Sequence, residues 1–243
     1  MEPTSNCSSA SGGAFFAGAA AVMQAVESET LILYHTALGD DWPEAGARAL
    51  AARLPYLRRL AANRAGTASR ASLAGIALAL RALARLLGRQ VAPAELVFAQ
   101  GEKPRLASRA PLAATPAAPI AHAVQAGPAT EGLDFSIAHS GPWVACAALA
   151  RGRVGLDVEM GTDARIADWV VREAALKASG EGLRAAQAVR ALDWSQAHAC
   201  WRGERWHLRR LDLFPGASAC VLTSIAPLTI EARVVAVGEL FAP

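Results

Sequence analysis

The sequence predicts an α+β fold, in which one chain forms two lobes that each combine helices with a small sheet. The chain has 243 residues, of which 53% are hydrophobic, enough to bury a core in one large domain or two small lobes. Helical and strand-like segments are mixed in both halves of the chain. An Ala/Pro-rich tract without periodicity lies between the halves and is typical of a linker.

These features divide the chain into four predicted segments. Residues 1–28 are rich in Ser, Gly and Ala and are expected to form a loose leader. The N-terminal lobe is expected to cover 29–110, the linker 111–131, and the C-terminal lobe 132–243. No internal sequence repeat is visible.

In the N-terminal lobe, the apolar run "TLILYHTAL" (30–38) predicts a strand. A helix is predicted to follow, with Asp41 as its N-cap, Pro43 in its first turn and Glu44 closing a capping box. A second helix is expected to end at Gly88, and its apolar stripe comprises Leu73, Ile76, Leu80, Leu83 and Leu87. A short strand is predicted in "AELVFAQ", at 94–100.

In the C-terminal lobe, a helix is expected over roughly 164–179. Strand-like runs precede and follow it, separated by turn residues such as Ser-Gly-Pro and Arg-Gly. The runs are 133–140, 143–150, 153–159, 204–213, 217–225 and 229–237.

The charge distribution is uneven, although the net charge is only +3. From Ala45 to Ala94 the chain carries nine arginines and no acidic residue. This arginine tract (Arg48, Arg53, Arg58, Arg59, Arg64, Arg70, Arg81, Arg85 and Arg89) fits either a solvated helix face or a docking surface for phosphate or an acidic partner. Because it contains no aromatic residue besides Tyr56, a nucleic-acid-binding surface is disfavoured.

The expected location is the cytoplasm, without a membrane anchor. The four cysteines show no close pairing, so neither a zinc site nor a disulfide framework is indicated. The apolar run near the N-terminus lacks a basic n-region and is too short to span a bilayer.

Charged residues gather at the end of the strand-like segment "VGLDVE" (154–159) and in the helix that follows. Residues i and i+2 of a strand face the same way, so Asp157 and Glu159 would present two carboxylates on one face. In the helix, Trp169, Glu173 and Lys177 share one stripe. The arrangement predicts either an Mg²⁺ site with three carboxylates, or an exposed acidic strand end beside an ordinary Glu–Lys pair. The spacing alone leaves both open.

Lysine is rare in this chain, and both lysines lie in motifs. Of 24 basic residues only Lys103 and Lys177 are lysines. A lysine is a compact point charge and an arginine a planar fork, so the two are not interchangeable at a tight phosphate site.

Four motifs occur along the chain in this order: "GEKPRL" (101–106), "FSIAHSGPWVACA" (135–147), "VGLDVE" (154–159) and "WVVREAALKASGEGL" (169–183). Together they resemble the 4′-phosphopantetheinyl transferases of the monomeric, two-lobed type that activates surfactin synthetase. That family shows G-K-P-x-L, F-N-x-S-H-S-G, G-x-D-x-E and W-x-x-K-E-A-x-x-K in this order. The resemblance covers roughly residues 30–225.

The resemblance implies a fold, a reaction and a set of site residues. The two lobes would be related by a pseudo-twofold, with the active site between them. The enzyme would move the phosphopantetheine arm of coenzyme A to a serine of an acidic acyl or peptidyl carrier protein, releasing 3′,5′-ADP. Asp157, Glu159 and Glu173 would bind Mg²⁺, and Glu173 is the candidate general base. Lys177 would offset charge on the leaving group. The contacts to the phosphates of coenzyme A would come from Lys177, His139, Lys103 and Arg70.

The chain departs from the family pattern at three places. Only nine residues separate Glu159 from Trp169, where the family usually has a few tens, so the C-terminal lobe is expected to be shortened. Ala138 replaces a serine, which implies a lost phosphate contact, and Arg172 replaces a lysine. An alternative is therefore a transferase-like protein that binds coenzyme A or a carrier without catalysing transfer.

Overall fold

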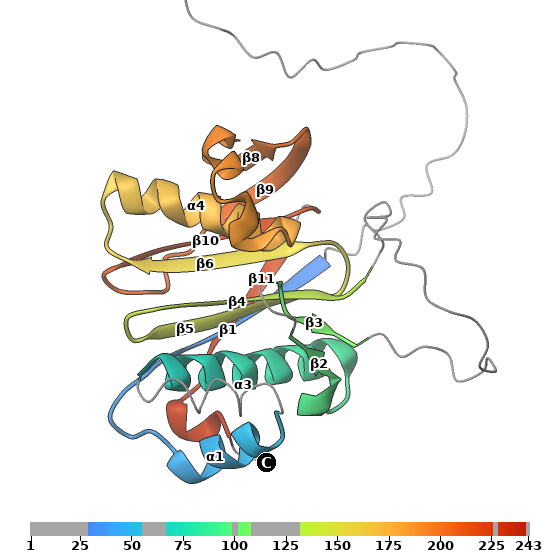
Figure 1. Ribbon diagram of the computed structural model, residues 1–243, viewed down its shortest axis with the longest axis vertical. Coiled ribbons are helices and arrows are strands. Elements are labelled where there is room, and N and C mark those ends of the chain that lie inside the picture. The colour runs from blue at the N-terminus through green and yellow to red at the C-terminus, as the bar shows by residue number, and fades with distance from the viewer. Residues whose placement is uncertain (1–28, 55–66, 99–101, 108–131, 226–227, 242–243) are drawn as a thin grey trace, which may run out of the picture.

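The computed structural model shows an α+β protein and describes residues 29–54, 67–98, 102–107, 132–225 and 228–241. Within these ranges the chain forms two larger sheets, a two-stranded sheet and three α-helices. Figure 1 shows the layers in order: α4, the sheet that contains β6 and β10, the sheet that contains β1, β4 and β5, then α3 and finally α1.

The first sheet has the strand order β11-β1-β5-β4. It comprises β1 (Glu29–Ala37), β4 (Asp134–Ser140), β5 (Trp143–Leu149) and β11 (Leu228–Val234). β1 and β11 pair in parallel, with Leu31 opposite Ile230, whereas the other neighbours are antiparallel. This sheet therefore combines strands from both ranges, 29–110 and 132–243, that the sequence analysis assigned to separate lobes.

The second sheet is antiparallel, with the order β6-β10-β9-β8-β7. Its strands are β6 (Val154–Met160), β7 (Asp193–Trp194), β8 (His198–Trp201), β9 (Glu204–Arg210) and β10 (Ala217–Thr223). Side chains of both sheets alternate between two faces. Leu33 and Leu149 of the first sheet and Leu156 and Val221 of the second belong to one buried cluster between the sheets.

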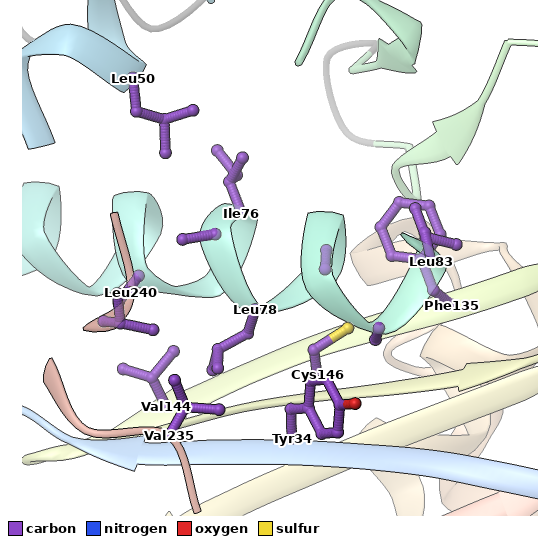
Figure 2. Close-up of a cluster of buried hydrophobic side chains, with 14 of the residues drawn as sticks. Tyr34, Leu50, Ile76, Leu78, Leu83, Phe135, Val144, Cys146, Val235 and Leu240 are labelled. Carbon is purple, nitrogen blue, oxygen red and sulfur yellow. The ribbon is translucent and has the colours of Figure 1, made fainter. Parts of the chain in front are cut away.

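The helices cover the outer faces of the two sheets. α3 (Thr67–Leu87) packs on the first sheet, and α1 (Glu44–Ala52) packs on α3. Figure 2 shows their common core, where Ile76, Leu78 and Leu83 of α3 lie among residues of the sheet and of the C-terminal segment. α4 (Ala164–Ser179) covers β6 and β10 of the second sheet. Short 3₁₀ segments, η2 (Gly182–Ala185) and η3 (Ala188–Ala191), follow α4.

Two predicted helices are confirmed. α4 occupies 164–179. Its N-cap is Asp163, whose carboxylate accepts hydrogen bonds from the N–H groups of Arg165 and Ile166, and its C-cap is the left-handed Gly180. α3 ends before Gly88, which has φ 62°. Its predicted apolar stripe is only partly confirmed, because Ile76 and Leu83 are buried, Leu73 and Leu80 are partly buried, and Leu87 at the end of the helix is 38% exposed. The buried face also includes the alanines Ala71, Ala74, Ala79 and Ala82.

Other predictions were wrong or fall outside the described residues. The predicted capping box at Asp41 is wrong, because α1 begins at Glu44 after Pro43 and has no side-chain cap. Trp42 is buried against Phe241, and tight turns surround it, with the N–H of Trp42 bonded to the carbonyl oxygen of Asp40 and the N–H of Glu44 bonded to that of Trp42. The side chain of Glu44 pairs with Arg70. The strand predicted at 94–100 is reduced in the described residues to β2 (Leu96–Val97), which pairs with β3 (Arg105–Leu106). The predicted leader, 1–28, and linker, 111–131, lie outside the described residues.

Candidate metal centre

Strand β6 turns its acidic residues toward α4. Leu156 and Val158 are fully buried between the sheets, as the strand alternation predicts. Asp157 and Glu159 therefore lie on the opposite face, which α4 covers. Asp157 is 2% exposed, whereas the side chain of Glu159 is partly exposed near the end of the strand.

A glycine in β6 brings α4 close to these acids. A Cβ on Gly155 would lie 1.9 Å from the carbonyl oxygen of Ala174 and 2.5 Å from the nitrogen of Ala178. Helix backbone therefore lies directly on the strand at this point, and only glycine permits that approach. Glu173 and Lys177 immediately precede these two alanines on α4, and both lie beside Asp157.

The structure brings together the three carboxylates that the sequence analysis selected. One carboxylate oxygen each from Asp157, Glu159 and Glu173 lies within 4.8 Å of the others. Lys177 donates a 2.7 Å hydrogen bond to Oδ1 of Asp157, and its Nζ lies 3.4 Å from Oε1 of Glu173. Among the described residues, Asp157, Glu159 and Glu173 form the group of acidic, His or Cys side chains whose spacing suits a metal ion.

Asp157 keeps one oxygen without a partner in the described residues. Its Oδ2 is buried and makes no hydrogen bond, although Oδ1 is bonded to Lys177. Burial raises the pKa of Asp157 to about 7, and the neighbouring carboxylates add to this, while Lys177 opposes it. A buried carboxylate oxygen without a donor is costly, so this position favours a bound cation.

Lys177 stays charged in this environment. Burial alone would lower the pKa of its ammonium, but the negative charges of Asp157 and Glu173 outweigh burial and raise the pKa. The lysine therefore offsets part of the negative charge of the cluster. Its side chain keeps 25% exposure and lines an adjoining pocket.

Side chains of β4 join the two sheets next to the cluster. Asp134, Ser136 and Ser140 accept hydrogen bonds from the backbone N–H groups of Val154 (2.7 Å), Leu156 (3.0 Å) and Met160 (3.1 Å), respectively. We call this row of bonds the β4–β6 seam. Ser140 also donates a 2.7 Å hydrogen bond to Oε2 of Glu159.

A pocket of about 320 Å³ opens beside the cluster, between α4, β4 and the segment before β3. Its polar lining includes Lys103, Ser136, Glu173, Lys177 and Arg184, and apolar walls are contributed by Pro104, Ile137 and Leu176. It thus combines an apolar body with cations, as a phosphate-bearing organic ligand requires.

The two lysines of the pocket are already bonded within the chain. Lys103 donates to Asp134 and, at 2.6 Å, to the carbonyl oxygen of Val154. Burial lowers the pKa of Lys103, while Asp134 opposes this. Arg184 could not be predicted from its local sequence, because its position depends on the 3₁₀ turn after α4. No ion pair or hydrogen bond of its guanidinium is found among the described residues.

The remaining sequence-predicted ligands, His139 and Arg70, are not among the residues that line the pocket. His139 is exposed as a whole residue, but its imidazole is partly buried, and this burial and then the positive charge of Lys177 lower the pKa of the ring. Arg70 pairs with Glu44 at 3.3 Å and stacks over Trp42, on the far side of the first sheet. It does not line the pocket.

Two departures from the family pattern lie away from the pocket lining. Ala138 is 2% exposed and occupies the β4–β6 seam between Ser136 and Ser140. Arg172 forms a bidentate pair with Asp168 and donates 2.8 Å bonds to the carbonyl oxygens of Val189 and Arg190. Its contacts therefore hold η3 against α4.

Much of the arginine tract is bonded within the chain. Arg58, Arg59 and Arg64 lie outside the described residues. Of the others, four make contacts: Arg70 with Glu44, Arg81 with the carbonyl oxygens of Glu239 and Leu240, Arg85 with Glu231, and Arg89 with Glu95. The three pairs with carboxylates leave a smaller net positive charge on this face than the sequence indicates, whereas the carbonyl contacts of Arg81 do not change its charge.

Comparison with known proteins identified no relative: the sequence matches no protein-family model, and no curated protein matches it significantly. Among the described residues, no helix has both the length and the apolar character needed to cross a membrane.

Proposed function

We propose that the protein is an Mg²⁺-dependent 4′-phosphopantetheinyl transferase, which transfers the phosphopantetheine arm of coenzyme A to a serine of an acyl or peptidyl carrier protein. The observation that carries the proposal is the convergence of Asp157, Glu159 and Glu173 beside a pocket lined by Lys103, Lys177 and Arg184. The order of motifs in the sequence supports the same reaction.

The donor set fits Mg²⁺. Three carboxylates without a histidine or cysteine match a hard cation that takes oxygen ligands and keeps positions for water and phosphate. The unpartnered Oδ2 of Asp157 supports a cation at this point. When bound, Mg²⁺ would neutralise the charge of the diphosphate and of the departing 3′,5′-ADP.

The pocket residues would hold coenzyme A next to the cluster. Lys177 is bonded to the carboxylates and lines the pocket, so its ammonium would contact a diphosphate oxygen of the bound ligand. Arg184 offers a guanidinium that is not committed to any described residue, so it suits a further phosphate. Ile137, Leu176 and Pro104 provide an apolar wall for an uncharged part of the same ligand.

The transfer itself is a displacement at phosphorus. The hydroxyl oxygen of the carrier serine attacks the phosphorus that bears the pantetheine arm, and the bond from this phosphorus to the ADP oxygen breaks. Glu173, which lines the pocket with 22% of its side chain exposed, accepts the proton of the hydroxyl. Lys177 stabilises the negative charge that moves to the leaving oxygen.

Under this function, the protein would be a monomer with two lobes related by a pseudo-twofold, and its partner would be an acidic carrier protein. Among the described residues, Arg48 and Arg53 are the arginines of the tract whose guanidinium groups make no intramolecular bond, and they would attract such a partner over long range.

Intact mass spectrometry tests the proposal. The full chain, coenzyme A and Mg²⁺ are incubated with a panel of apo carrier proteins, and one carrier should gain the mass of one phosphopantetheine group. Asp157→Ala should slow this reaction by about 100-fold or more, since a catalytic metal supplies several kcal/mol of transition-state stabilisation. Asp193→Ala removes an exposed carboxylate on β7 and is the matched control, expected to react at the normal rate.

Two results would reject the proposal in different ways. Near-normal turnover by Asp157→Ala at limiting Mg²⁺ would exclude the metal assignment. Binding of coenzyme A without a mass change in any carrier would identify a protein that binds coenzyme A but does not transfer.

A further inference from the structure

Ser140 makes two hydrogen bonds at the place where the β4–β6 seam meets the carboxylate cluster. Its hydroxyl oxygen accepts a 3.1 Å bond from the N–H of Met160 and donates a 2.7 Å bond to Oε2 of Glu159. The other members of the seam, Asp134 and Ser136, accept bonds from the backbone of β6 farther from Glu159. Among the three side chains of the seam, Ser140 is therefore the one that bonds both to the backbone of β6 and to a carboxylate of the cluster.

The adjoining turn holds Ser140 in this position. Gly141 has φ 55°, and a Cβ at this residue would lie 2.8 Å from Cγ of Met160. The turn between β4 and β5 therefore lies directly against the end of β6. This close contact fixes the distance between the hydroxyl of Ser140 and the strand that carries Glu159.

Glu159 needs such a partner more than the other two carboxylates. Asp157 is buried and bonded to Lys177, and Glu173 has Lys177 as its neighbour on α4. Glu159 is partly exposed, close to the exposed Met160, and a glutamate loses considerable rotamer freedom when it is held in one conformation.

We propose that Ser140 is a positioning residue that orients Glu159 as a ligand for a divalent cation. This inference rests on the proposed function, since it concerns the same metal centre. The bond to Oε2 fixes the rotation of the carboxylate and leaves Oε1 for the cation. Partners that hydrogen-bond metal ligands in this way commonly contribute 10- to 100-fold to metal affinity.

Binding of Mn²⁺ alone to the full chain, followed by electron paramagnetic resonance of the free ion, tests this role without relying on turnover. Mn²⁺ favours the same oxygen ligands as Mg²⁺. Ser140→Ala should weaken binding by about 10- to 100-fold. Ser136→Ala is the matched control, because it removes one seam bond, to the N–H of Leu156, and leaves Glu159 untouched. It should change affinity by less than about threefold, well below the loss that a ligand-orienting partner causes.

The isosteric variants Ser140→Thr and Ser140→Val distinguish the effect of the hydroxyl from the effect of side-chain shape. They also provide the test if Ser140→Ala does not fold. Ser140→Thr keeps the hydroxyl and should bind Mn²⁺ nearly as well as the unmodified protein. Ser140→Val has the same shape without the hydroxyl and should lose as much affinity as Ser140→Ala.

The outcomes distinguish this inference from the proposed function. If the unmodified protein binds Mn²⁺ and Ser140→Ala or Ser140→Val binds it equally well, the positioning role is wrong and the metal centre stands. An equal loss in Ser136→Ala would also overturn it, because the seam would then act only through stability. If the unmodified protein binds no Mn²⁺, the metal centre itself is wrong.

Discussion

Completing the β4–β6 seam should stabilise the protein. Asp134, Ser136 and Ser140 bond to the N–H groups of residues 154, 156 and 160, so the alternation of both strands places Ala138 opposite the N–H of Val158. Alanine has no acceptor there. Ala138→Ser would supply a hydroxyl at a site where both residues are buried.

The size of the effect follows from the cost of a buried N–H without a partner. Such a group costs roughly 1–3 kcal/mol, and a typical hydrogen bond contributes a net 0.5–1.5 kcal/mol, because water is displaced from both partners. Since serine must also bury its own hydroxyl, we expect the free energy of unfolding to rise by about 1 kcal/mol. The opposite change in the same seam, Ser136→Ala, should lower it by about 1–3 kcal/mol.

Urea denaturation of the two variants and the unmodified chain measures this directly. The midpoint should rise for Ala138→Ser and fall for Ser136→Ala, with the slope unchanged, because neither substitution alters the surface exposed on unfolding. A loss in Ser136→Ala without any gain in Ala138→Ser would show that the Val158 N–H does not face residue 138. No effect in either variant would refute the contribution of the seam to stability.

Three further predictions concern the candidate site. Gly155→Ala should lower the free energy of unfolding by about 3 kcal/mol or more in urea denaturation, since the new Cβ overlaps the backbone of α4, whereas Gly238→Ala, which meets no atom within 4 Å, should have little effect. Without metal, the folded state holds a proton on Asp157 that the unfolded chain releases between about pH 4 and pH 7, so the free energy of unfolding should fall as pH rises through this window. Asp157→Asn should remove that part of the decline. If the free energy of unfolding in chelator-containing buffer has the same slope against pH in both proteins, the raised pKa is contradicted. Arg184→Ala should raise the KM for coenzyme A about tenfold or more with little change in kcat, whereas Arg190→Ala, an exposed arginine of η3 outside the pocket lining, should not; equal KM values would exclude Arg184 from the binding site.

The parts of the site that follow from local periodicity could be predicted from the sequence. Asp157 and Glu159 share a strand face, and Glu173 and Lys177 are one helical turn apart, so each pair follows from its strand or helix assignment. The approach of the two pairs to one another depends on the packing of α4 on β6 at Gly155. Leu156 and Val158 are buried because of the same strand alternation.

The parts that depend on distant segments could not. Nothing near Lys103 in the sequence indicates that Asp134 would bind its ammonium, and nothing near Arg85 indicates a pairing with Glu231. The bond from Ser140 to Glu159 requires the register between β4 and β6, which belong to different sheets. Asp41 failed as a cap because the burial of Trp42, a tertiary contact, overrides the local capping signal.

The parallel pairing of β1 with β11 has a consequence for how the protein is made. β1 lies inside the first sheet, but one of its two neighbours is residues 228–234, and the helix layer above it is closed by Val235 and Leu240. During synthesis on the ribosome, the edge of β1 that pairs with β11 therefore stays unpaired until almost the whole described chain has been made. Such long-range pairing folds slowly and exposes a strand edge to other chains in the meantime. We therefore expect nascent chains that stop before residue 228 to depend on chaperones.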